Sequence, residues 1–288
     1  MAKIERVGVV GCGLMGSGIA QVCAQAGFRT MVREVSPDRL EGGLRSISKR
    51  LERLEDKEKI NAAEREAALA RIDGTTELAD LAECDMVIEA VVEDLEVKNA
   101  LWRELEAICS PEAIFASNTS SLTITEMAAT TGGRGRLIGL HFFNPVPVMQ
   151  LVEVVGTIET NHSVLESATD FVRRLGKEPI ACRDASGFVV NRLLVPYMMD
   201  AIRMLEQGVA SAEDIDKGMQ LGAGHPMGPL ALCDFVGNDT LARIGDIMYE
   251  EYRERRYAAP PLLKRMVSLG RLGRKSGRGF YEYPEDGG

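Results

Sequence analysis

The sequence predicts an α/β fold, in which a doubly wound, mainly parallel sheet with a helical hairpin insertion is followed by an all-helical second domain. Three observations indicate this fold. Short apolar segments of strand character alternate with segments of helical periodicity in the first part of the chain. A glycine-rich turn directly follows the first of these apolar segments. The strand signals then cease, and the rest of the chain is mostly helical in pattern.

The predicted strands are short runs of apolar and β-branched residues. Near-continuous apolar runs such as Met86–Ile88 are typical of strands that are covered on both faces, as parallel sheets require. The sheet is therefore expected to lie between two layers of helices. The predicted strands are Arg6–Val10, Thr30–Val32, Met86–Val92, Ala113–Ala116, Leu137–Leu140 and Leu151–Val155.

The interval between the second and third predicted strands is too long for a simple crossover. It holds a charged segment from Glu41 to about Asp73, in which apolar residues recur at helical spacing with basic residues between them, as in Leu44–Leu54. We predict a projecting helical hairpin. Charge runs of this kind usually form a solvated helix pair, and the residues alone favour that interpretation over a clamp for an anionic ligand.

A domain boundary is predicted where the strand pattern ends, at Asp184–Gly187. The first domain would cover residues 1–185 and the second residues 186–288. The second domain begins with an apolar helix around Phe188–Leu205 and ends in a glycine-rich basic tail.

The composition excludes several broad classes of protein. The chain has 288 residues and is 45% hydrophobic, which is enough for a substantial core in two domains. Its formal charge of -9 argues against a nucleic-acid partner, because an acidic surface repels phosphates. No segment resembles a secretory leader or reaches the length of a membrane span. The six cysteines are scattered and no cluster has metal-ligand spacing, so we expect a metal-free protein of the reducing cytoplasm.

The glycine-rich turn Gly11-Cys12-Gly13-Leu14-Met15-Gly16 lies between a predicted strand and a predicted helix, which is the context of a Rossmann-type dinucleotide site. In such a turn, Gly11 permits the tight bend and Gly13 lets the backbone approach a pyrophosphate, while Gly16 allows close helix packing. The amino terminus of the helix attracts the phosphates. These residues predict that the chain binds a dinucleotide.

An acidic residue about twenty positions further on bears on the choice between NAD and NADP. Glu34 ends the second predicted strand, where its carboxylate can accept hydrogen bonds from the adenosine ribose hydroxyls. The same carboxylate would repel a 2′-phosphate, which favours NAD over NADP. Arg33 weakens this preference, because a neighbouring guanidinium tolerates a phosphate.

Polar residues near the ends of later strands suggest an acid/base site. A neutral imidazole is suited to remove a hydroxyl proton as hydride leaves, and His141 follows the fifth predicted strand. Glu153, in the next apolar strand, needs a polar partner and is expected to orient this imidazole. Ser120, and Asn191 on the first helix of the second domain, are candidates to hold the reacting oxygen.

Structural roles remain open for each of these residues when it is taken alone. A single histidine near a core strand is more often a packing residue than a catalyst, and Asn118–Ser121 has the residues of a helix cap. The positions at two successive strand ends favour the catalytic interpretation.

Several ordered motifs resemble those of the L-3-hydroxyacyl-CoA dehydrogenase family, and most closely those of its short bacterial members that act on 3-hydroxybutyryl-CoA. The similarity runs nearly from end to end of the chain. The motifs that carry it are Gly11–Gln21, Ala116–Leu122, His141–Pro145, Ser186–Arg192, His225–Pro229 and Gly273–Tyr281.

The resemblance implies an NAD-dependent enzyme that interconverts (S)-3-hydroxyacyl-CoA and 3-ketoacyl-CoA, with short acyl chains favoured. It implies that His141 is the acid/base and Glu153 its partner, with Ser120 and Asn191 at the reacting oxygen. It also implies a helical second domain that contributes to the substrate cleft and forms a homodimer. The NAD contacts that it implies are Glu34, Glu93, Lys98, Ser120, Asn144 and Lys275.

The resemblance reverses the interpretation of the charged hairpin, which becomes the expected docking site for coenzyme A. Arg53 and Lys57 are then the expected phosphate partners, with Ser120 also near the substrate and Ser46 or Ser48 as further contributors. Two alternatives remain open: a related NAD-dependent dehydrogenase of a free hydroxy or sugar acid, and an NAD-binding or redox-sensing protein without catalysis.

Overall fold

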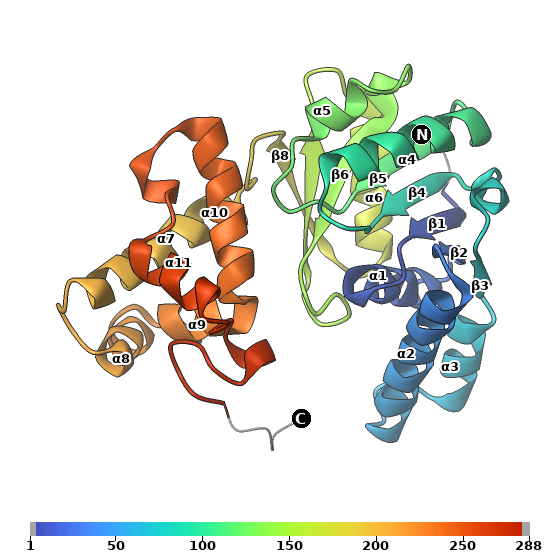
Figure 1. Ribbon diagram of the computed structural model, residues 1–288. Helices are drawn as coiled ribbons and strands as arrows, with labels where there is room; N and C mark the ends of the chain where they lie inside the picture. The colour runs from blue at the N-terminus through green and yellow to red at the C-terminus, as the bar shows by residue number, and fades with distance from the viewer. Residues whose placement is uncertain (1–3, 284–288) are drawn as a thin grey trace. The chain divides into compact units, whose positions relative to one another are not determined.

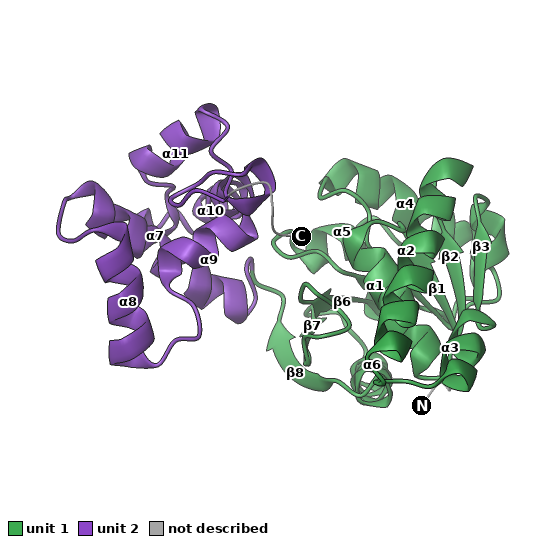
Figure 2. Ribbon diagram, turned by 90° about the horizontal axis from the view of Figure 1, so that it is seen from below, with its two compact units in different colours: residues 1–185 green, residues 186–288 purple. Residues whose placement is uncertain are grey.

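The structure is a computed structural model that describes residues 4–283. The chain divides into two compact units, residues 1–185 and residues 186–288, which Figure 2 colours separately. The first unit contains the sheet and the second is helical (Figure 1). The predicted fold class, a doubly wound sheet followed by a helical domain, is confirmed.

Among the described residues the sheet has eight strands in the order β3-β2-β1-β4-β5-β6-β7-β8. Every neighbouring pair is parallel except β6 and β7, which are antiparallel. The strands are β1 (Arg6–Val10), β2 (Arg29–Arg33), β3 (Ile72–Thr75), β4 (Met86–Glu89), β5 (Ile114–Ser117), β6 (Leu137–Phe142), β7 (Leu151–Gly156) and β8 (Glu178–Arg183).

Helices cover both faces of this sheet. Alternate strand residues such as Val7 and Val9 pack in one buried cluster with helices α1, α2, α3 and α6. On the other face, α4 packs on α5, and α5 packs on β6. Trp102 of α4 stacks on Phe115 of β5. These helices are α1 (Leu14–Gln25), α2 (Pro37–Asp56), α3 (Ala62–Leu69), α4 (Leu95–Ile108), α5 (Ile124–Ala128) and α6 (His162–Arg174).

Several predicted boundaries were wrong. Strand β6 extends to Phe142, so His141 lies inside the strand and not after it, and β4 already ends at Glu89. Strands β3 and β8 were not predicted from the sequence. The first contains only one large apolar residue, Ile72, and the second is a half-exposed edge strand, so neither has the apolar run that identifies a buried strand.

The charged insertion is the predicted helical hairpin, and α2 and α3 pack against each other. It begins at Pro37, earlier than expected, because Ser36 caps α2 by accepting a hydrogen bond from the Arg39 amide. The second helix begins with a reciprocal capping box between Asn61 and Glu64. Helix α2 is 20 residues long and its buried residues are Gly43, Ile47 and Leu51, so most of its surface is solvated.

Two buried carboxylates organise the second unit. Asp216 caps α9 by accepting hydrogen bonds from the amides of Leu230 (2.7 Å) and Ala231 (2.8 Å). Asp234 accepts hydrogen bonds from the amides of Phe280 and Tyr281, both at 2.9 Å, and so fixes the glycine-rich tail. The helices of this unit are α7 (Val190–Glu206), α8 (Ala212–Ala223), α9 (Pro229–Val236), α10 (Asn238–Tyr252) and α11 (Pro261–Ser268).

No helix within residues 4–283 combines the length and the apolar character that crossing a bilayer requires.

Candidate active site

The carboxyl ends of β1, β2, β4, β5 and β6 lie at one edge of the sheet, because these strands are mutually parallel. The chain order reverses between β1 and β4, and ligands of open α/β sheets bind outside the strand ends at such a switch point. The predicted site residues of the first unit that lie in or after these strands therefore share one edge.

The glycine turn after β1 leaves no room for side chains where it is packed. Gly11 has φ +94°, and a Cβ atom there would lie 2.6 Å from the Ala90 carbonyl oxygen. A Cβ atom at Gly16 would lie 1.7 Å from the Gly11 carbonyl oxygen, whereas one at Gly13 would meet nothing within 4 Å. Gly13 is the N-cap of α1, whose first turn contains no acidic residue. An exposed glycine at an uncapped helix terminus fits a bound pyrophosphate.

Glu34 is held next to this turn by backbone amides. Its Oε2 accepts a hydrogen bond from Cys12 N at 2.8 Å, and its Oε1 accepts one from Val35 N at 2.7 Å. Arg33 donates from Nε to the Thr76 carbonyl oxygen at 3.2 Å. A cavity of about 670 Å³ opens here, and its lining includes Gly11, Gly13, Arg33, Glu34, Arg39 and the aliphatic residues Val35, Val92 and Val97. The residues present fit an adenosine with a free ribose diol.

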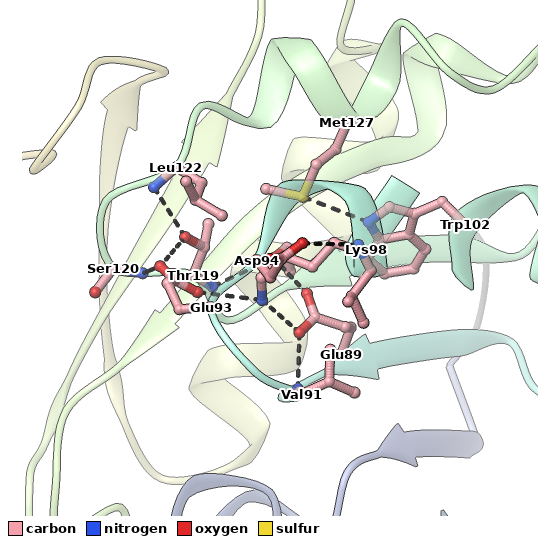
Figure 3. Close-up of polar contacts among 12 residues, drawn as sticks. Glu89, Val91, Glu93, Asp94, Lys98, Trp102, Thr119, Ser120, Leu122 and Met127 are labelled. Carbon is pink, nitrogen blue, oxygen red and sulfur yellow. Dashed lines mark hydrogen bonds and ion pairs between the residues drawn. The ribbon is translucent and has the colours of Figure 1, made fainter. Parts of the chain in front are cut away.

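Buried charges lie at the ends of β4 and β5 (Figure 3). The Lys98 ammonium lies 2.5 Å from Oε1 of Glu89 and 3.2 Å from Oε2 of Glu93. The side chains of Lys98 and Glu89 are 1% and 0% exposed. Two carboxylates thus share one buried ammonium group, and of the three side chains only Glu93, at 23% exposed, is open to water. A buried cation of this kind is stable only with such partners.

The Glu93 carboxylate connects this cluster to the loop after β5. Its Oε1 accepts hydrogen bonds from Thr119 Oγ1 (2.5 Å), Ser120 N (3.1 Å) and Ser121 Oγ (3.2 Å). Burial alone would raise the pKa of Glu93, but Lys98 and the Thr119 and Ser120 donors outweigh it and lower the pKa. Glu93 is therefore held as an anion that orders the loop containing Ser120.

His141 and Glu153 face each other directly across the antiparallel pair β6 and β7. His141 Nδ1 lies 2.5 Å from Glu153 Oε2, and the Glu153 side chain is 0% exposed. Asn118 Oδ1 accepts a hydrogen bond from Phe142 N at 2.9 Å, which ties the β5 loop to the same strand. The arrangement is an imidazole oriented by a buried carboxylate.

The other predicted contacts are distributed over both units. Asn144 is exposed directly after β6, and Arg53 and Lys57 are exposed at the carboxyl end of α2. Asn191 lies in the first turn of α7 and Lys275 in the basic tail, so both belong to the second unit. Lys275 forms an ion pair with Asp239 at 2.6 Å.

Sequence reasoning missed two charged residues of the first unit. Glu89 ends an otherwise apolar strand, and this placement of a carboxylate was the available signal. Arg50 donates to Gln21 Oε1 at 2.7 Å and to Ser46 Oγ at 2.8 Å, so it joins α2 to α1. Its spacing from Ile47 and Gly43 on α2 would have placed it on the face that packs on the sheet unit.

No group of three or more His, Cys, Asp or Glu side chains within residues 4–283 is arranged to hold a metal ion. Burial, with a smaller contribution from Glu34, raises the pKa of Cys12 to about 11, so this thiol stays protonated at neutral pH.

Known proteins resemble this chain over nearly its whole length. The family described as "3-hydroxyacyl-CoA dehydrogenase, NAD binding domain" matches residues 6–185, and "3-hydroxyacyl-CoA dehydrogenase, C-terminal domain" matches residues 187–283. A 3-hydroxybutyryl-CoA dehydrogenase of Mycobacterium tuberculosis is 51% identical over 97% of this chain and 99% of its own length. The human mitochondrial hydroxyacyl-coenzyme A dehydrogenase is 46% identical, over 97% of this chain and 91% of its own.

Solved structures agree. The crystal structure of (S)-3-hydroxybutyryl-CoA dehydrogenase from Ralstonia eutropha superposes with a TM-score of 0.96 at 43% identity, covering 98% of this chain and all of that one.

Proposed function

The chain belongs to the 3-hydroxyacyl-CoA dehydrogenase family, whose first domain binds NAD, and from this premise we propose that it interconverts (S)-3-hydroxybutyryl-CoA and acetoacetyl-CoA, with His141 as the general acid/base. The observation that carries the proposal is the buried pair of His141 and Glu153, which lies at the same sheet edge as the glycine turn and Glu34.

The proposed NAD site runs along this edge. The pyrophosphate would lie at the amino terminus of α1 beside Gly13, and the adenosine ribose would hydrogen-bond to Glu34. Glu93, Lys98, Ser120 and Asn144 would line the part of the site further along the edge, and Lys275 would contribute from the second unit. When bound, NAD supplies the hydride acceptor.

The proposed proton transfer uses the orientation that Glu153 imposes. In the proposed arrangement Nδ1 of His141 would donate to the Glu153 carboxylate, which leaves the lone pair of the ring on Nε2. Nε2 would take the proton of the C3 hydroxyl group as the hydride leaves C3. Glu153 would then stabilise the imidazolium. Ser120 and Asn191 would hold the reacting oxygen.

The coenzyme A portion is proposed to dock on the hairpin of α2 and α3. Arg53 and Lys57 are exposed there and would pair with the phosphates. Arg50, anchored to Gln21 and Ser46, fixes α2 relative to the glycine turn. The α-helical second unit would complete the substrate site and form a homodimer.

We also propose that the protein works in the reducing cytoplasm and in short-chain fatty acid metabolism, because its cysteines form no disulfide and because its relatives are named for acyl-CoA substrates. All six cysteines are free thiols and five of them are buried.

The test is steady-state NADH oxidation with a series of 3-ketoacyl-CoA lengths, with free acetoacetate in parallel. We expect turnover with the thioesters, highest for acetoacetyl-CoA, and little with the free acid. Equal turnover with free acetoacetate would favour a dehydrogenase of free acids instead. NADH binding without turnover of any thioester would contradict the proposal and favour a non-catalytic NAD-binding protein.

A further inference from the structure

Glu89 has no part in the proton transfer or in the expected NAD contacts, yet its side chain is fully buried at the end of β4. Figure 3 shows the polar contacts that it makes there. Its Oε1 accepts from Val91 N at 2.8 Å and from the Lys98 ammonium at 2.5 Å. Its Oε2 accepts from Ser117 Oγ at 2.7 Å. One carboxylate thus connects the ends of β4 and β5 to the first turn of α4.

Lys98 transmits this connection to Glu93. The ammonium is 1% exposed and lies between Glu89 at 2.5 Å and Glu93 at 3.2 Å. Both carboxylates are within ion-pair distance of the ammonium, so its position is set by the balance between attraction to Glu89 and attraction to Glu93. If Glu89 lost its charge, Glu93 would remain as a partner, and the ammonium would be drawn toward it.

Glu93 contacts both Lys98 and the loop after β5, so the position of Lys98 affects this loop. Its Oε1 accepts from Thr119 Oγ1 and from the amide of Ser120, while its Oε2 faces Lys98. A shift of the Glu93 carboxylate toward α4 or away from it therefore moves the acceptor to which the Ser120 amide is bonded. Glu89, Lys98, Glu93 and Ser120 form one continuous chain of contacts.

We propose that Glu89 is a positioning residue of the dinucleotide site: by holding Lys98, it fixes Glu93 and the loop of Ser120 in the arrangement that receives NAD. The inference deepens the proposed function and rests on it. Glu89 itself does not contact the dinucleotide.

Glu89→Gln isolates the charge. The amide oxygen of Gln can still accept from Val91 N, and its NH₂ group can donate to Ser117 Oγ, since a hydroxyl group both donates and accepts. The fold is therefore kept while the attraction to Lys98 is weakened. We expect NADH affinity, measured by fluorescence titration without substrate, to fall about tenfold, which is the lower end of the loss on removing a group that orients a metal ligand.

Glu106→Gln is the matched control, because Glu106 lies on the same helix and also holds a loop. Its carboxylate accepts hydrogen bonds from Gly132 N (2.9 Å) and Gly133 N (2.8 Å) at the far end of α4. This variant should lower the melting temperature and leave NADH affinity unchanged. An equal loss of NADH affinity in both variants would mean that Glu89 only stabilises the fold, and would overturn the proposal.

The Lys98→Met background tests whether Glu89 acts through Lys98. Without the ammonium, Glu89 and Glu93 are two neighbouring carboxylates that have lost the cation they share, so adding Glu89→Gln should no longer weaken NADH binding and should partly restore it. The same loss in both backgrounds would contradict a path through Lys98.

Amide hydrogen exchange of the protein without NAD provides a readout that is independent of activity. Glu89→Gln should speed exchange at residues 117–122, whereas Glu106→Gln should do so near residues 132 and 133. If Glu89→Gln fails to fold, Glu89→Asp, which withdraws the carboxylate by one methylene, takes its place, and wild-type NADH affinity in that variant would overturn the proposal. If the wild-type enzyme turned over no thioester, the proposed substrate would be wrong. The NADH titrations would still test the role of Glu89, because they need no substrate.

Discussion

The candidate site has two ends, one where β1 and β2 end and one around β4 to β7, and the two are built in opposite ways. At the β1–β2 end, glycines and backbone amides leave a cavity of about 670 Å³, and Glu34 is the acidic side chain beside the glycine turn. At the β4–β7 end, space is filled by buried charged groups in close pairs, such as Lys98 with Glu89 and His141 with Glu153. The β1–β2 end needs glycines, whose lack of a side chain leaves space, and the β4–β7 end needs its buried charges to be paired. Added atoms should therefore damage the first end, and removed charges the second.

The largest effect is expected from removing the imidazole. His141→Ala should lower kcat by on the order of 10²–10⁴, the usual contribution of a general acid/base. NADH affinity by titration should stay unchanged, because the dinucleotide end is intact. His162→Ala is the control, since the His162 side chain is 86% exposed and lies next to Glu166 on the surface of α6. Unchanged turnover in His141→Ala would remove this residue from the mechanism.

At the β1–β2 end, an added methyl group in the glycine turn should weaken NADH binding. In Gly16→Ala the new Cβ atom would lie 1.7 Å from the Gly11 carbonyl oxygen, so the turn must shift. Overpacking of this kind costs about 1–3 kcal/mol, or roughly five- to 150-fold in NADH affinity if it falls on the bound state. Gly42→Ala, on α2, meets nothing within 4 Å and should bind NADH normally while gaining some helix stability. Normal NADH binding by Gly16→Ala would show that the turn can adapt.

A smaller effect is expected from Glu34, which lines the cavity beside the glycine turn. Glu34→Ser should lower NADH affinity about tenfold, through lost hydrogen bonds to a charged acceptor. NADPH use should rise relative to NADH, because the repulsion of a 2′-phosphate disappears and Arg33 and Arg39 line the same cavity. Adding Arg39→Ala should reverse part of this gain. A ratio of kcat/KM for the two cofactors that does not move would show that Glu34 does not select between them.

The smallest effect concerns pH. The pKa of Glu93 is lowered in the folded protein, despite burial, by Lys98 and by the Thr119 and Ser120 donors. A carboxyl group with a lowered folded pKa stabilises the fold above its unfolded value, near 4.5, and this stabilisation is lost as the pH falls through the folded pKa. Urea unfolding of Glu93→Gln should therefore depend less steeply on pH below about 4.5 than the wild type. Glu104→Gln, at an exposed position, is the control. If the free energy of unfolding of Glu93→Gln and of the wild type changed with pH in parallel, the prediction would be wrong.

The fold class was predictable because it depends on local patterns. Apolar runs, helical spacing and the glycine turn each lie within a few consecutive residues, and they gave the buried strands and the hairpin. Strands β3 and β8 escaped because edge positions need no apolar run. The placement of His141 inside β6 was missed for a related reason, since a polar residue within a strand looks like the end of that strand in the sequence.

The sequence by itself determined six of the eight strands of the sheet, and it gave the dinucleotide turn with Glu34 and the pairing of His141 with Glu153 as expectations, because each depends on residue type and short-range spacing. Only the tertiary structure decided that Glu89 and Glu93 share Lys98, and that Glu93 holds the loop of Ser120 from 27 residues away in the sequence. The physical reason is that burial and ion pairing arise where strands that are distant along the chain end side by side, and no local pattern records which charges meet there.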